Sequence, residues 1–229
     1  MPRIHFQLQL TELKDKMLAM AALSQQAVES AVDAYLQRDK GLCKFVKQNE
    51  AAVNTAQRDL DEMAAELLAK EQPMAVDLRF ILAVIKINGD LERIGDQAKN
   101  IARRATKIAG ESRLPRAVIG LRSMAELAAA QLNDVLDAYA QRDVERAKAV
   151  WNRDLELDAL EDSVFRDLLT FMMEDARNIT FCTHLLFCSK NLERVGDHAT
   201  NIAETVVYIV TGESMPGERP RGIDSTAAP

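Results

Sequence analysis

Aromatic residues make up only 5% of the 229-residue sequence, and the runs of β-branched and aromatic residues that sheets prefer are rare. Proline and glycine are also few, at 6 and 9 residues. Alanine, leucine, glutamate, aspartate and arginine dominate instead, and most of these are good helix formers. The composition therefore predicts an all-α protein.

An excess of basic residues is absent as well. The chain has 29 Lys and Arg against 35 Asp and Glu, which gives a formal net charge of −6. No basic stripe stands out in the sequence, whereas a nucleic-acid surface needs clustered Lys and Arg to neutralise phosphates. We therefore expect no nucleic-acid partner.

Cysteines and long apolar runs are equally limited. The three cysteines have no CxxC spacing, which is typical of reduced thiols rather than of a disulfide framework. The N-terminal residues lack the apolar region of a secretory signal. The longest apolar stretches fall far short of the roughly 20 residues that a membrane-spanning helix needs. These features predict a cytoplasmic location.

The apolar periodicity predicts six helices, at about 8–38, 42–71, 75–109, 116–141, 144–175 and 179–211. From Phe80 to Ile108, apolar residues recur at alternating spacings of four and three, and the same spacing returns from Phe181 to Ile209. Such spacing places them on one stripe of a helix. Short connections favour antiparallel helices in a bundle over a coiled-coil rod.

The second half of the chain repeats the first. Between residues 88–102 and 189–203, nine of fifteen residues are identical, and the tripeptide Gln-Arg-Asp at 37–39 recurs at 141–143. The sequence thus predicts two tandem pseudo-symmetric three-helix bundles. We expect the first repeat at 1–112, the second at 113–212 and a disordered tail at 213–229.

Each repeat carries the motif Leu-Glu-Arg-(Ile or Val)-Gly-Asp. Its polar residues recur every four positions and so share one helix face: Glu92, Asp96 and Asn100 in the first copy, and Glu193, Asp197 and Asn201 in the second. At 100° per residue this row points away from the apolar stripe, which predicts a site on the bundle surface. Glycine is costly inside a helix, so Gly95 and Gly196 indicate the close approach of a neighbouring helix or a ligand.

A related spacing occurs on the second predicted helix of each repeat, with Glu50 and Asn54 in the first and Asp154 and Asp158 in the second. If the rows meet, each repeat offers a cluster of carboxylate and amide oxygens, which suits Mg²⁺, Mn²⁺, Ca²⁺ or iron. The second cluster would have four acids and the first three acids plus an amide, so we expect tighter binding at the second. A solvated acidic face, balanced by nearby arginines, is the alternative.

No catalytic set is apparent. The chain has no Walker loop, no dinucleotide-binding glycine pattern and no Glu-x-x-His pair of the kind that di-iron bundles use. His198 follows Asp197 but points about 100° away from it, so it is either an extra metal ligand or a surface or interface histidine. A carboxylate-rich metal-binding enzyme or a metal store remains the alternative function.

The doubled motif resembles the PhoU family of bacterial phosphate-signalling proteins over about residues 6–212, with further support at 70–79 and 170–175. The resemblance implies a PhoU-like fold with metal clusters on paired acidic motifs, the ion being Mg, Mn, Fe or Zn. Carried onto this chain, the implied ligands are Asp154, Asp158, Glu193 and Asp197 in the second repeat, and Glu92, Asp96, Glu50 and Asn54 in the first. Asn54 departs from the acidic pattern of the family.

By the same resemblance, the protein is expected to be a negative regulator of the phosphate-starvation response and of phosphate uptake. The implied partners are a PhoR-like phosphate-sensing histidine kinase and the PstB-like ATPase subunit of the high-affinity phosphate ABC transporter. The resemblance also implies a homodimer that is not an enzyme and that meets the membrane only through its partners.

Overall fold

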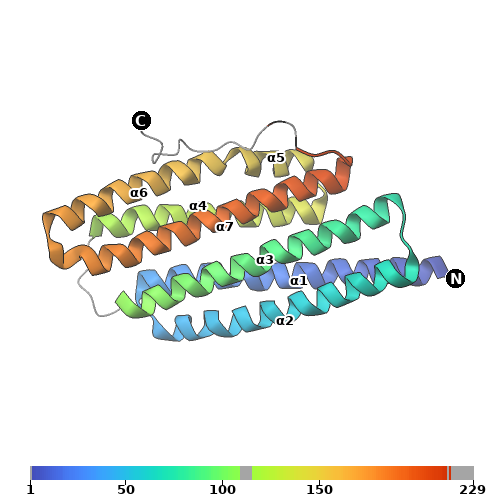
Figure 1. Cartoon of the computed structure of the whole chain (residues 1–229), viewed down its shortest axis with the longest axis horizontal. Helices are drawn as coiled ribbons and strands as arrows, with labels where there is room; N and C mark the ends of the chain where they lie inside the picture. Colours follow the sequence, from blue (N-terminus) through green and yellow to red (C-terminus); the bar gives the residue numbers. More distant parts are fainter. Residues whose placement is uncertain (1, 109–114, 216, 218–229) are drawn as a thin grey trace.

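The computed structural model describes residues 2–108, 115–215 and 217, and the described chain is helical with no strand (Figure 1). The elements follow one another as α1 (Pro2–Gln37), α2 (Lys40–Glu71), α3 (Ala75–Ile108), α4 (Pro115–Gln141), α5 (Val144–Asn152), α6 (Asp154–Glu174), the short 3-10 helix η1 (Ala176–Asn178) and α7 (Ile179–Thr211). The all-α prediction is confirmed.

Two of the expected helices differ from those observed. The first begins at Pro2 rather than near residue 8, and the helix expected over 144–175 is divided at Arg153 into α5 and α6. Gln131 on α4 donates from Nε2 to the Arg153 carbonyl at 2.9 Å, and the Arg153 guanidinium binds Asp134 on the same helix at 2.7 Å. These contacts with α4 hold the chain at the break.

The repeated Gln-Arg-Asp tripeptide builds the same turn twice. Arg38 and Arg142 adopt left-handed backbone angles, with φ of 59° and 56°. The aspartate that follows each arginine caps the next helix: Asp39 accepts from the backbone of Gly41 and Leu42, and Asp143 caps α5. Aspartate at this position satisfies amide groups that a helix start leaves without partners. The sequence repeat is therefore also a structural repeat.

Helices α1–α3 form one bundle and α4–α7 the other, with α3 and α7 side by side between them (Figure 1). The apolar stripe of α7 is buried throughout, and that of α3 is buried except for the half-buried Phe80. Because Arg79 stacks on Tyr208 while Arg104 reaches His184, α3 and α7 run antiparallel. The two expected three-helix units are confirmed, although the expected boundary at 112/113 and most of the expected tail lie outside the described residues.

Cys182 and Cys188 are buried core residues and Cys43 is half-buried, and all three are free thiols.

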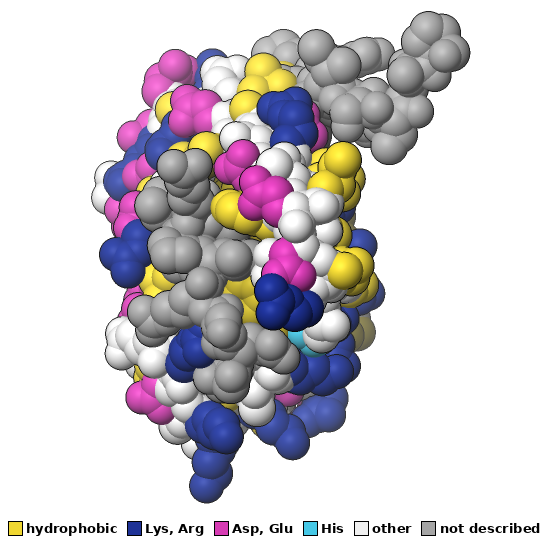
Figure 2. Space-filling view, turned by 90° about the vertical axis from the view of Figure 1, so that its left-hand side faces the viewer, with side chains coloured by type: hydrophobic (Ala, Val, Ile, Leu, Met, Phe, Trp, Pro, Cys, Tyr) yellow, Lys and Arg dark blue, Asp and Glu magenta, His cyan; other side chains and the backbone are white. Residues whose placement is uncertain are grey.

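In the described part of the chain, every helix is too short or too polar to cross a bilayer. At the end of the molecule seen in Figure 2, acidic and basic side chains are interspersed among hydrophobic ones.

Candidate functional site

The acidic row of α3 faces α2, and the two rows meet at the seam between these helices. Glu50 is only 8% exposed, and its negative charge acts on Glu92 across the seam. Asn54 donates from Nδ2 to Glu50 Oε1 at 2.6 Å. The residues predicted for the first site, Glu50, Asn54, Glu92 and Asp96, therefore lie together, and we call them the first cluster.

Lys99, which the sequence pattern did not predict as part of the site, lies within the first cluster. Lys99 Nζ is 2.7 Å from Glu50 Oε1 and 3.3 Å from Asp96 Oδ1, so its ammonium group joins α2 to α3. The hydrogen bond to Glu50 is the main cause of a raised Lys99 pKa, against the opposing effect of burial. Lys99 follows Asp96 by three residues, and that spacing was the available signal.

Burial, followed by the charge of Asp96, raises the pKa of the Glu92 carboxyl. Arg93 lies 3.5 Å from Glu92 and offsets part of this effect. The charged form of Glu92 is thus disfavoured, even with Arg93 and Lys99 beside it.

The second cluster forms at the seam between α6 and α7. It holds Asp154, which is 4% exposed, together with the half-buried Asp158, Glu193 and Asp197. Thr200 on α7 donates its hydroxyl to Asp154 at 3.1 Å, which ties the two helices together. The charges of Asp158 and Asp197 both act on Glu193. The four residues predicted for the second site therefore share one seam.

Glu161 extends this cluster and was missed in the sequence, although it lies one helical turn beyond Asp158. Burial is the main cause of its raised carboxyl pKa, and the nearby Asp158 adds to the effect. Lys190 contacts Glu193 at 2.8 Å within α7. The second cluster therefore gathers five carboxylates, against three in the first.

One oxygen of the Glu193 carboxylate accepts from Lys190, whereas the other has no donor in the described part of the chain. Burial raises the pKa of its carboxyl, and the charges of Asp197 and Asp158 act in the same direction. Its Oε2 atom is buried and has no hydrogen-bond partner among the described residues. A buried carboxylate oxygen without a donor is costly, and a hard cation would satisfy it.

The expectation that the acidic rows point outward is only partly right. Glu50 and Asp154 are buried, and the motif acids are half-buried, because the neighbouring helix covers the side of the row. Among the described residues, no three His, Cys, Asp or Glu side chains converge as a preformed ligand set. The donor chemistry of the second cluster fits a hard cation, and metal binding at these eight residues stays a prediction.

The two motif glycines lie against side chains of a neighbouring helix, as the sequence predicted. A Cβ atom on Gly95 would lie 3.3 Å from Val53 on α2, and one on Gly196 would lie 2.4 Å from Leu157 on α6. The neighbour is a helix in both cases. The glycines therefore set the width of the seams that hold the acidic clusters.

His198 lies at the interface between the two bundles. Its Nδ1 atom is 2.9 Å from Asp90 Oδ1 on α3, and Asn201 donates to the same oxygen at 3.2 Å. The structure thus supports the interface reading of His198.

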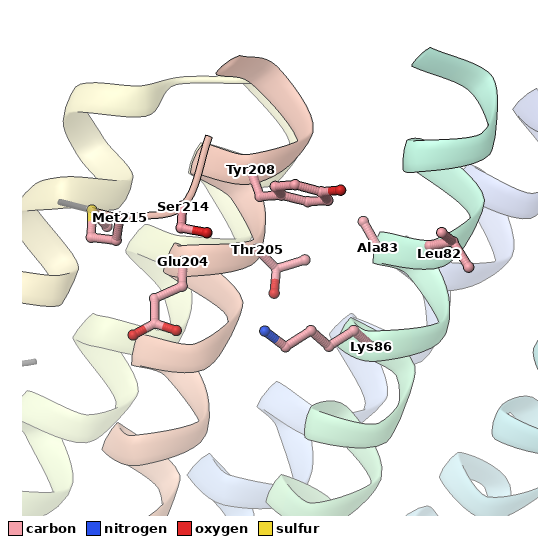
Figure 3. A pocket seen from close by; sticks show the side chains of 8 residues that line it. All are labelled: Leu82, Ala83, Lys86, Glu204, Thr205, Tyr208, Ser214 and Met215. Carbon is pink, nitrogen blue, oxygen red and sulfur yellow. The ribbon is translucent and has the colours of Figure 1, made fainter. Parts of the chain in front are cut away.

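A cavity of about 320 Å³ lies between α3 and α7, away from the clusters. Lys86 points toward Thr205 and Glu204 across it, and Tyr208 covers the end near Ala83 (Figure 3). Toward the opposite end of the α3–α7 pair, the repeat-related positions carry Arg104 and His184, 3.2 Å apart. The Arg104 guanidinium lies 4.0 Å from the ring centre of Phe187. The described residues that line the cavity include Lys86, Glu204 and three hydroxyls, and no histidine or cysteine is among them.

Comparison with protein families finds the PhoU domain twice, over residues 17–105 and 121–206. The chain is 49% identical over 217 residues to the "Phosphate-specific transport system accessory protein PhoU homolog" of Rhizobium meliloti, covering 94% of this chain and 91% of that protein. The protein of the same name from Caulobacter vibrioides is 42% identical over 213 residues, covering 93% of each.

Solved structures agree with these sequence relationships. PhoU from Pseudomonas aeruginosa superposes with a TM-score of 0.88 at 37% identity, covering 91% of this chain and all of that one. The phosphate transport system regulatory protein PhoU from Streptococcus pneumoniae gives a TM-score of 0.84 at 28% identity, covering 92% and 99%. The similarity extends over both repeats.

Proposed function

This chain belongs to the PhoU family, and we propose that it is a negative regulator of the phosphate-starvation response and of phosphate uptake. In this proposal it acts in the cytoplasm as a homodimeric adaptor between the ATPase subunit of a phosphate ABC transporter and a phosphate-sensing histidine kinase. The observation that carries the proposal is the PhoU match over both repeats, together with relatives named as accessory proteins of phosphate-specific transport.

An exposed apolar stripe on α6 supports the adaptor role. Phe165, Leu169 and Met173 recur at one-turn intervals and are 41%, 40% and 88% exposed. The corresponding positions of α2 carry Asp61, Ala65 and Ala69. A row of large apolar side chains on one helix face is typical of a protein interaction surface. The stripe therefore gives α6 a candidate contact surface that the corresponding positions of α2 lack.

A metal ion at the second cluster fits the same role. It would lie between α6 and α7 and neutralise carboxylates whose pKa is raised mainly by burial, such as Glu193 and Glu161. In this proposal the ion fixes α6, and with it the apolar stripe, against the bundle. The chemistry that the ion supplies is charge neutralisation.

The test is a chromosomal deletion assayed with a reporter for phosphate-starvation genes. We expect strong reporter expression in phosphate-rich medium, and repression again when the wild-type gene is restored. A Leu169→Asp variant should fail to restore repression, whereas Ala65→Asp at the corresponding position of α2 should restore it at equal protein level. Normal repression in the deletion strain would overturn the proposal.

The competing enzyme reading has the cavity as one place for its site. An enzyme needs a nucleophile and a base together in a pocket, and the described lining holds the Thr205, Ser214 and Tyr208 hydroxyls with Lys86 and Glu204. The relatives are named as accessory proteins of phosphate-specific transport, which favours the regulatory role. Turnover of phosphate esters by the purified protein, lost on Glu193→Gln while partner binding persists, would favour an enzyme instead.

A further inference from the structure

We propose that Lys99 is the resident cation of the first cluster and that its ammonium group keeps divalent metal ions out of that site. The inference rests on the part of the proposed function that assigns metal to the carboxylate clusters. The repeated motif occurs in both clusters, and the inference distinguishes the first cluster from the second.

The Lys99 ammonium group occupies the position that a bridging ion would need. It lies 2.7 Å from Glu50 on α2 and 3.3 Å from Asp96 on α3, so it links carboxylates of two helices. Its charge also acts favourably on Glu92. A metal ion entering between these groups would meet a tethered cation, and the repulsion between like charges at such distances is strong in a partly buried site.

A second group also donates a hydrogen bond to the Glu50 carboxylate. Oε1 accepts from Lys99 Nζ at 2.7 Å and from Asn54 Nδ2 at 2.6 Å. A metal ion that takes this oxygen must displace both donors. The residue that corresponds to Asn54 in the second repeat is Asp158, which supplies an acceptor instead of a donor.

In the second repeat, the position that corresponds to Lys99 carries no lysine. The residue that corresponds to Lys99 is Thr200, a neutral side chain that donates to Asp154 at 3.1 Å. A hydroxyl can rotate its proton away and still offer a lone pair to a metal ion. Lys190 donates a hydrogen bond to Glu193 within α7, and its charge also acts on Glu161 of α6. The buried Asp154, however, accepts its hydrogen bond from the neutral Thr200. The two repeats thus differ at this position: in the first, a lysine hydrogen-bonds the buried acid of the neighbouring helix, and in the second a neutral hydroxyl does so.

The experiment compares Mn²⁺ binding by the purified full chain and three variants, using equilibrium dialysis and elemental analysis. We expect Lys99→Thr, which installs the residue of the second repeat, to bind more Mn²⁺ per chain than the wild type. Adding Glu92→Gln to that variant should abolish the gain. Lys107→Thr, which removes an exposed lysine near the end of the same helix, should bind as the wild type does.

A second measurement needs no change at Lys99. In the otherwise wild-type chain, Glu92→Gln should leave Mn²⁺ binding unchanged, whereas Glu193→Gln should reduce it. Lower binding in Glu92→Gln, or no gain in a folded Lys99→Thr, would overturn the inference. Loss of reporter repression is measured separately, so failure of the adaptor role and failure of this inference are distinguishable.

Discussion

Replacing Gly196 by alanine is expected to destabilise the protein, whereas the same change at Gly95 should be nearly neutral. Both glycines lie inside long helices, where alanine is intrinsically better than glycine by about 1 kcal/mol. The propensity gain is therefore shared, and any difference between the variants reports the space available at each seam. That difference can be worked out from the positions of the neighbouring side chains.

At Gly196 the new methyl group would lie 2.4 Å from Leu157 Cδ2 and 3.0 Å from Gln131 Oε1. Leu157 is 1% exposed, and Gln131 is held by its hydrogen bond to the Arg153 carbonyl. Overpacking costs about 1–3 kcal/mol, and a 2.4 Å contact with a buried side chain belongs in the upper half of that range, about 2–3 kcal/mol. After the propensity gain of about 1 kcal/mol is subtracted, the net loss should be about 1–2 kcal/mol. At Gly95 the nearest atom, on Val53, is 3.3 Å away and needs to move by only a few tenths of an ångström.

The assay is urea unfolding followed by circular dichroism and by the fluorescence of Trp151, the single tryptophan. A loss of 1–2 kcal/mol corresponds to a melting temperature lower by roughly 2–8 °C in a domain of this size. In a double-mutant cycle, Leu157→Ala should remove most of the cost of Gly196→Ala. If Gly196→Ala proves as stable as Gly95→Ala, the seam is wider than the structure shows and the reasoning is wrong.

Three further changes test the electrostatics and the interface. Since burial raises the pKa of Glu193, its ionised form costs stability above its ordinary pKa of 4.5 and the cost disappears as the pH falls. Glu193→Gln should therefore raise the melting temperature of chelator-treated protein at pH 7, and the gain should shrink in acid. Burial also raises the pKa of Cys188 from 9.0 to about 12, so the folded protein should lose about 1.4 kcal/mol per pH unit above pH 9 from this thiol. Cys188→Ala should show a shallower alkaline decline in unfolding free energy; an identical decline would contradict this. Asp90→Asn weakens the contacts with His198 and Asn201 and should cost about 1–2 kcal/mol in urea unfolding, whereas unchanged stability would mean that these contacts contribute nothing.

The helices and the repeat could be predicted because their signals are local. The four-and-three apolar spacing of α3 and α7 indicates which side of each helix is buried, and the Gln-Arg-Asp tripeptide indicates a turn. The glycines of the doubled motif also indicated close helix approach correctly. In each case, residues a few positions apart carry the information.

The remaining features depend on residues far apart in the sequence. The break at Arg153 is held by Gln131, 22 positions earlier, and the partner of His198 is 108 positions away on α3. The burial of Glu50 and the insertion of Lys99 depend on how α2 lies against α3. Single-helix geometry placed the acidic rows on a face but could not show how much of that face the next helix covers.

The break at Arg153 has a mechanical consequence. Because α6 starts anew at Asp154, beside the second cluster, a change in its direction at that point would not require α5 to change direction with it. Met173 lies 19 residues from Asp154, or about 28 Å along the helix axis. A tilt of only about 10° at Asp154 would move Met173, at the far end of the apolar stripe, by about 5 Å. A small change at the second cluster would therefore move the exposed stripe of α6 by a much larger distance.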